Sequence, residues 1–200
     1  GKLDYVKEAG LTEIDKPNIS KMLLWEDPIL GHLQGDLKGL SLNQYYLKLH
    51  LQLLSASKQR GYNNYLIFPA RLAKVLSIKA DMHRNIKKAV LKNDQPYLKQ
   101  VALKAISELK IAVKKLCEEH RKVWLRNFKP FGFEILESRY GGLLITIAGL
   151  GLLVKHFLID GNIPVEFFEI TPPVYSEGLK HSYTYRRCIS PAHLWTGFNY

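Results

Sequence analysis

The strongest constraint on the fold of this 200-residue chain is a long row of apolar residues at helical spacing. Its members recur at steps of three, four or seven: Leu98, Ala102, Ala105, Leu109, Ala112, Leu116 and Val123. A helix has 3.6 residues per turn, so such steps place all of them on one face. The row spans about eight turns. It predicts a long helix over residues 97–126 with one buried face.

A second row precedes it and predicts a partner helix over residues 66–92. Its members are Leu72, Val75, Leu76, Met82, Ile86, Ala89 and Val90. Pro69 falls near the expected start of this helix, where a missing N–H is tolerated. The sequence N-D-Q-P at 93–96 then interrupts the pattern, with Asp94 as the expected N-cap of the next helix. A link this short predicts an antiparallel helical hairpin.

Residues 133–159 predict a further helix, or two helices with a kink at Gly141-Gly142. Gly161 is the expected C′ residue that ends this segment. Its most apolar part, 143–159, contains Lys155 and His156. A membrane-spanning helix needs about 20 apolar residues. The sequence therefore predicts a buried core helix and no membrane span.

The remaining segments are less regular. Residues 1–40 contain Pro17, Pro28 and five glycines and predict an irregular junction segment. Over 41–53 helix and strand compete, because leucines 47, 49, 51 and 53 alternate. We favour a helix with a capping box at Ser41–Gln44. Residues 161–200 predict an extended or short-strand tail packed on the bundle. The expected fold is mainly α, an antiparallel helical bundle over 41–160.

The charge balance is compatible with a nucleic-acid-binding protein and with a helical bundle whose surface lysines are only solvated. The net charge is +11 and the pI about 9.6, which is compatible with a surface that binds nucleic acid. However, the lysines are spread along helices and no run of five like charges occurs. We therefore favour a lysine-coated bundle. Two cysteines, Cys117 and Cys188, are weak support for a reducing, cytoplasmic location. The start at Gly1 leads us to expect a fragment of a longer protein.

Catalytic and metal-binding patterns are sparse. The seven histidines form no H-x-x-x-H pair, and the cysteines form no C-x-x-C pair, so we expect neither metal nor cofactor. Cys117 and His120 could form a nucleophile and base on one helix face. Their neighbours Glu118 and Glu119 oppose a reactive thiolate. Adjacent acids such as Glu26 and Asp27 do not face each other across a glycosidic bond. The sequence predicts no catalytic residue.

Trp25, Glu26 and Asp27 are the candidate binding residues. An exposed indole next to carboxylates could stack on a sugar ring while the acids accept hydrogen bonds from hydroxyl groups. We expect the set to lie at a junction with another domain, and direct sugar contact is the less favoured of the two roles. The structural alternatives are core packing of Trp25 and a turn cap at Asp27-Pro28. We favour core packing also for Trp124 and Trp195.

Five segments together resemble a known family. They are L-L-W-E-D-P-I-L-G at 23–31, the helix at 70–86, K-N-D at 92–94, W-L-R-N-F-K-P-F-G-F-E-I at 124–135 and R-Y-G-G-L at 139–143. In this order they resemble the C-terminal helical domain of a bacterial branch of glycoside hydrolase family 20, the β-N-acetylhexosaminidases. The resemblance implies that catalysis belongs to a preceding barrel, whose aspartate–glutamate pair assists attack by the substrate's own N-acetyl group.

A barrel needs about 250 residues by itself, so this chain cannot contain one. No catalytic residue is therefore carried over, and the expected partner is the barrel of the same polypeptide, with an N-acetylhexosamine-containing glycan possible at the junction. We expect a non-catalytic accessory domain. The alternative is a free-standing basic helical module that binds nucleic acid or a protein.

Overall fold

A computed structural model describes residues 19–31, 33–34, 37, 40–59 and 63–163. Its elements are α2 (Ile19–Trp25), α3 (Leu42–Ser57), α4 (Asn63–Lys79), α5 (Met82–Leu91), α6 (Gln95–Tyr97), the five-residue π-helical turn η1 (Leu98–Ala102), α7 (Leu103–Asn127) and α8 (Phe133–Asp160). No strand occurs in this part of the chain, which confirms the mainly helical prediction. The predicted tail, Cys188 and Trp195 lie outside the described residues.

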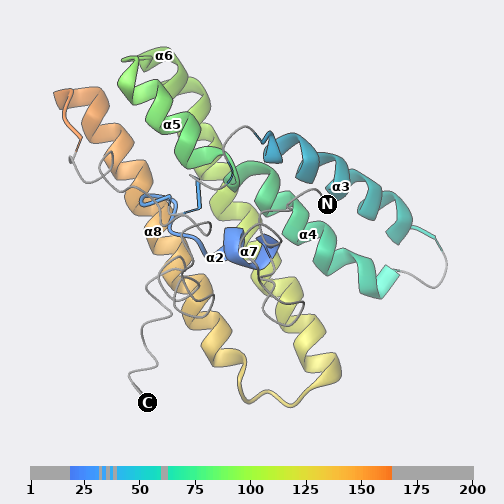
Figure 1. The fold of residues 1–200 in the computed structure, drawn as a ribbon. Coiled ribbons are helices and arrows are strands. Elements are labelled where there is room, and N and C mark those ends of the chain that lie inside the picture. Colours follow the sequence, from blue (N-terminus) through green and yellow to red (C-terminus); the bar gives the residue numbers. More distant parts are fainter. Residues whose placement is uncertain (1–18, 32, 35–36, 38–39, 60–62, 164–200) are drawn as a thin grey trace, which may run out of the picture.

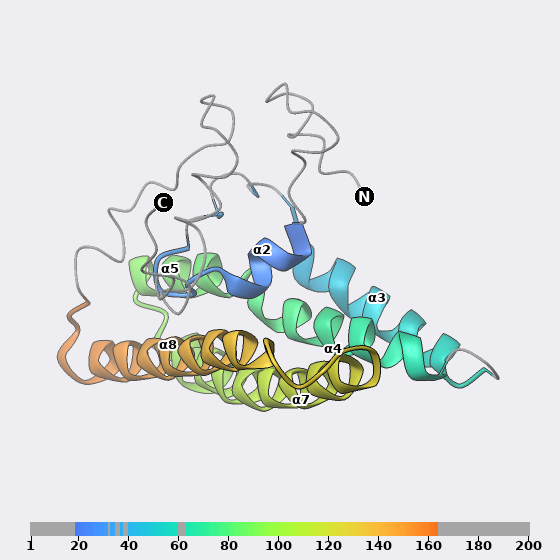
Figure 2. The same cartoon turned by 90° about the horizontal axis from the view of Figure 1, so that it is seen from below.

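The helices form two antiparallel pairs that share a core. Helices α3 and α4 make one hairpin, and the long helices α7 and α8 make the other (Figure 1). Helix α4 packs along α7 and so joins the pairs. Helices α2 and α5 lie on the same side of the α7–α8 pair (Figure 2).

The core follows the apolar rows of the sequence. Side chains that are completely enclosed include Leu76, Leu98, Leu109, Leu116, Leu143 and Ile147. Helix α2 adds Met22, Leu23, Leu24 and Trp25 to the same core. A seven-residue helix is too short to be stable alone, so this apolar contact with the bundle must stabilise it.

Two predicted helix ends are confirmed. Asp94 caps α6 by accepting a hydrogen bond from the N–H of Tyr97 at 3.0 Å, and Pro96 lies in the first turn. Gly161 follows α8 with a left-handed φ of 71°, and its N–H donates to the Phe157 carbonyl at 2.9 Å. Both capping hydrogen bonds join residues three or four positions apart, so the local sequence is enough to predict them.

The predicted helix over 66–92 is wrong in two respects: it is two helices, and the first of them starts too early for Pro69 to lie in its first turn. Helix α4 begins earlier, at Asn63, so Pro69 lies inside it, and it ends at Lys79. Helix α5 begins at Met82 with Asp81 as its N-cap. An apolar row continues across such a break because both helices bury a face in one core. The row alone therefore cannot reveal the break.

One other segment differs from the expectation: residues 19–25 are helical where irregular chain is expected. Residues 133–160 form one uninterrupted helix, the first of the two alternatives for this segment. The helix over 42–57 is confirmed, but the side chain of Ser41 makes no capping hydrogen bond. Among the described residues, α8 is the one helix whose length and composition would suit a membrane span. The same test is passed by core helices of soluble proteins.

Candidate functional site

Trp25 is the last residue of α2 and packs inside the domain. Only 3% of its surface is exposed. Its ring meets the Tyr140 ring edge-on at 4.9 Å between centroids, a favoured aromatic geometry. The Arg139 guanidinium lies 6.0 Å from the centroid of the same indole ring. This geometry favours the packing alternative for Trp25.

Glu26 and Asp27 use their carboxylates to shape the chain that follows α2. Glu26 Oε1 accepts the Leu33 N–H at 2.7 Å. Asp27 Oδ1 accepts the N–H groups of Ile29 at 2.7 Å and Leu30 at 3.3 Å, which is a turn cap next to Pro28. Burial raises the pKa of Glu26 above its usual value, against the lowering effect of Lys79 and of its hydrogen bonds. The two acids thus act as acceptors for backbone groups.

Lys79 is the residue of this region that sequence reasoning missed. Lys79 is 3% exposed, and its ammonium donates to the carbonyls of Leu23 and Glu26, at 2.6 Å each. The last carbonyls of a helix lack intrahelical partners and carry partial negative charge, so this cation caps α2. Burial lowers the pKa of Lys79 to about 8, while Glu26 and Asp27 act in the opposite direction. The sequence hints at this role in one way: Lys79 occupies a position of α4 at which the helical spacing predicts a buried apolar residue.

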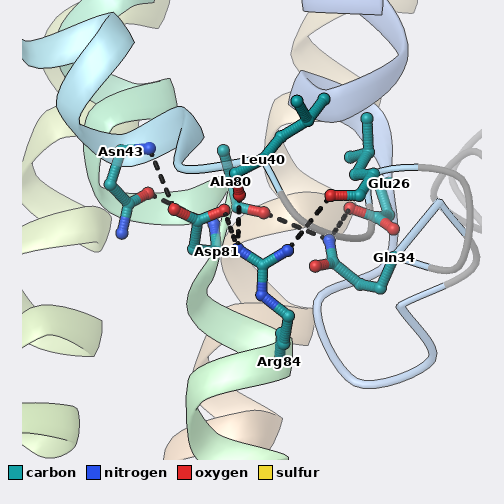
Figure 3. Close-up of polar contacts among 8 residues, drawn as sticks. Glu26, Gln34, Leu40, Asn43, Ala80, Asp81 and Arg84 are labelled. Carbon is teal, nitrogen blue, oxygen red and sulfur yellow. Dashed lines mark hydrogen bonds and ion pairs between the residues drawn. The ribbon is translucent and has the colours of Figure 1, made fainter.

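A cluster of polar side chains fixes the break between α4 and α5 (Figure 3). Asn43 and Asp81 exchange two hydrogen bonds, from each backbone N–H to the other side chain. Arg84 donates to Asp81 Oδ1 at 2.7 Å and to the carbonyls of Leu37 and Leu40. Gln34 Nε2 donates to the Ala80 carbonyl at 3.1 Å and to Glu26 Oε2 at 3.3 Å. The chain after α2 is thereby tied to the α4–α5 break.

A cavity of about 570 Å³ opens beside Trp25, and its volume is within the usual range of ligand pockets. Its walls are mostly apolar side chains of α2, α3, α4 and α8. Two hydrogen-bonded pairs add polar groups, Ser20 with Tyr46 at 3.0 Å and His120 with Tyr140 at 3.1 Å. Burial lowers the pKa of His120. The cavity could hold an apolar group that carries a hydroxyl or amide.

The cysteine–histidine pair does not form a nucleophilic site. His120 Nδ1 bonds to Tyr140 Oη rather than to Cys117. Burial raises the pKa of the half-buried Cys117 thiol; Arg121 lowers it and Glu118 raises it. Cys117 is therefore a thiol at neutral pH, as a boundary cysteine would be. Over the described ranges, no three His, Cys, Asp or Glu side chains are grouped to hold a metal ion.

Comparison with known families gives one match. The sequence model described as the Glycoside Hydrolase 20C C-terminal domain matches residues 1–166. This match covers all the helices of the structure and most of the chain. A comparison with curated proteins found no match.

Proposed function

Because the chain belongs to the family of Glycoside Hydrolase 20C C-terminal domains, we propose that it is a non-catalytic accessory domain of a β-N-acetylhexosaminidase. In this proposal a preceding barrel hydrolyses terminal N-acetylhexosamine residues. The present domain packs against that barrel and supports the walls of its site. The observation that carries the proposal is the family match over residues 1–166.

The geometry of the acids supports a non-catalytic role. General acid–base catalysis needs a carboxyl group that can reach the substrate. Glu26 and Asp27 are 2% and 7% exposed and accept backbone hydrogen bonds. They stabilise the chain after α2 instead.

The place of Trp25, Glu26 and Asp27 at the domain junction stays a prediction. Its support comes from the backbone of the turn after α2, which Lys79 holds at the carbonyls of Leu23 and Glu26. The side chains of Trp25, Glu26 and Asp27 are themselves 3%, 2% and 7% exposed. Direct stacking of a sugar on Trp25 has less support, because the indole already packs on Tyr140. The cytoplasmic location is likewise proposed from cysteine content alone.

Hydrolysis of an aryl N-acetyl-β-glucosaminide tests the proposal. The chain alone should give no turnover above buffer. The parent enzyme should be compared with a variant that ends before this domain. We expect the truncated barrel to lose thermal stability, kcat/KM or both. Equal values for the two proteins would contradict an accessory role, and turnover by the chain that survives repurification would contradict the non-catalytic assignment.

One observation favours the alternative of an anion-binding module. Arg71 and Lys74 of α4 and Lys115 of α7 line a cavity of about 340 Å³, together with Glu108. Non-specific contacts of this kind give dissociation constants of about 0.1 mM to 1 µM for nucleic acid at physiological salt. Binding in that range, lost at higher salt, would agree with the accessory proposal. A sequence-selective nanomolar complex would favour the alternative.

A further inference from the structure

Helix α8 has a second apolar face that the described part of the chain does not cover. Its inner face carries Leu143, Ile147, Leu150, Val154 and Phe157, all buried. On the outer face Ile145 is 75% exposed, Leu152 57% and Ile159 78%. These three are seven residues apart, the repeat of a coiled coil. A soluble domain rarely exposes so many large aliphatic side chains in one line without a partner.

Ala148 and Lys155 occupy the places between these three, and Gly141 precedes them on the same line. The line runs through Gly141, Ile145, Ala148, Leu152, Lys155 and Ile159, with steps of four and three in alternation. We call these six residues the outer seam. Such steps keep one row of side chains facing a second helix along its whole length. Lys155 is its one charged member, and a lysine stem can cover apolar surface while its ammonium reaches water.

Gly141 adds an independent observation. A Cβ built at this residue would meet no atom within 4 Å, and its φ is not positive. At Gly149 and Gly151 the added Cβ would contact Ile29 at 3.6 Å and Ile106 at 3.4 Å. A glycine inside a helix costs about 1 kcal/mol relative to alanine. No contact among the described residues accounts for this cost at Gly141, whereas close approach of another helix would.

We propose that the outer seam binds the outer seam of a second copy of this chain, with the two α8 helices antiparallel around a two-fold axis. The axis passes near the level of Leu150. Each small residue then lies opposite a large one: Ala148 faces Leu152 of the second copy, and Gly141 faces its Ile159. The seam is therefore complementary to itself, as a two-fold interface must be.

Charge and size argue against the parallel pairing. In a parallel pair in register, each residue would face its own copy. Lys155 would face Lys155, and the small residues Gly141 and Ala148 would leave gaps opposite each other. In the antiparallel pair Lys155 faces Ile145, so its stem covers an aliphatic side chain and no like charges meet.

A lipid bilayer is a poorer partner for this face. Helix α7 packs along α8 and exposes Lys104, Glu108, Lys114, Lys115 and Glu118. Entry of the α7–α8 pair into a membrane would remove several of these charges from water, at several kcal/mol each. A second protein surface can cover the seam and leave α7 in water. The inference does not depend on the proposed function.

Sedimentation equilibrium of the full 200-residue chain between about 1 and 100 µM tests the proposal. We expect a monomer–dimer equilibrium. Leu152→Glu should raise its Kd at least about tenfold, the loss expected for a central interface residue. Ile111→Glu is the matched control, because Ile111 is 56% exposed on α7 and lies off the seam. It should leave the Kd unchanged.

Gly141→Leu is a second seam variant, which tests whether the dimer can be lost without any loss of folding. The space around Gly141 is open, so the variant should fold with unchanged helical circular dichroism but should clash with Ile159 of the second copy. Its Kd should also rise at least about tenfold. A wild-type chain that stays monomeric at 100 µM would overturn the proposal. So would a dimer that both seam variants leave intact, or a monomer that floats with anionic lipid vesicles.

Engineered cysteines test the register. With Cys117 and Cys188 replaced by serine, the double variant Ala148→Cys, Leu152→Cys should form a disulfide-linked dimer under mild oxidation. Equimolar mixing of the two single variants should give the mixed dimer in preference to either homodimer. The antiparallel pairing brings position 148 of one copy to 152 of the other. Preferential homodimers of either single variant would contradict this pairing.

Discussion

Asn43 and Asp81 cap each other across 38 residues of sequence. The N–H of Asn43, in the first turn of α3, donates to Asp81 Oδ2 at 3.0 Å. The N–H of Asp81, at the start of α5, donates to Asn43 Oδ1 at 3.2 Å. The pair satisfies backbone donors at two helix starts, which would otherwise lack partners. It thereby fixes the α3–α4 hairpin to the point at which α4 ends.

Replacement of Asp81 by alanine should therefore destabilise the domain. The variant removes the acceptor for the Asn43 N–H and the partner of Arg84. We expect a loss of about 1–3 kcal/mol in the free energy of unfolding, measured by urea denaturation. Asp94→Ala is the control, because Asp94 is exposed and caps the Tyr97 N–H within its own turn. Equal losses in the two variants would contradict a special role for Asp81.

Leu109→Ala should cost about 2–5 kcal/mol, the range for a fully buried leucine. Leu109 is completely enclosed on the inner face of α7. Ile111, two residues later, is 56% exposed, so Ile111→Ala should cost under about 0.5 kcal/mol. Denaturant melts of both variants measure the contrast. A loss below about 0.5 kcal/mol at Leu109 would show that this residue is not in the core.

Stability should rise with pH just above pH 8 because of Lys79. Its pKa is about 8 in the folded protein against an ordinary 10.5, so the unfolded chain binds more protons between these values. The free energy of unfolding therefore increases as pH rises through this window. Between pH 8 and 9 we expect a gain of about 1 kcal/mol. Urea melts at 0.25-unit pH intervals measure it.

Other groups limit the window of that test. Burial raises the pKa values of Cys117 and Tyr140, so the folded state keeps their protons longer and their contribution falls with pH above about 9. Glu26 also has a raised pKa and acts in that same direction above its usual 4.5. Lys79→Met removes the cation and keeps most of the side-chain volume. A pH dependence between 8 and 9 that is unchanged in this variant would exclude Lys79 as its source.

Gly31→Ala should destabilise the turn after α2 by about 2–4 kcal/mol. Gly31 has a φ of 61°, and a Cβ would lie 2.4 Å from Cδ2 of His83. A double-mutant cycle with His83→Ala separates the two causes. Removal of the ring should relieve the steric part and leave only the left-handed backbone cost of about 1–2 kcal/mol. Additive losses would mean that the ring is not the obstacle.

The sequence predicts the long helices well because their burial is periodic. Leu98, Leu109 and Leu116 are enclosed as the apolar row implies. Ile106 and Val113 are equally buried but stand one residue away from members of that row. The break at Ala80-Asp81 was not predicted, because its cap comes from Asn43, a residue of another helix. Partners this distant leave no local pattern.

At the candidate site, too, the sequence predicts local contacts but not contacts with distant residues. The turn cap at Asp27 is one of the sequence alternatives, and it acts within three residues. Packing of Trp25 is another, but its partner Tyr140 is distant and could not be named. Lys79 had no local signal beyond a charged residue on an apolar row. Its partners are carbonyls of α2, which carry no side-chain information.

The anchoring of residues 19–40 has a consequence for motion. Lys79 holds the carbonyls of Leu23 and Glu26, and Arg84 holds those of Leu37 and Leu40. The donors of all four bonds, Lys79 and Arg84, flank the break between α4 and α5. Transient opening of the segment must therefore break them together and admit water to the buried ammonium. In hydrogen-exchange experiments the amides of Ile29 and Leu33 should lose protection at a common rate, as a single unit separate from α7 and α8. Above pH 8 their exchange should rise less steeply than intrinsic exchange, because opening returns Lys79 to its ordinary pKa and becomes less favourable as pH rises.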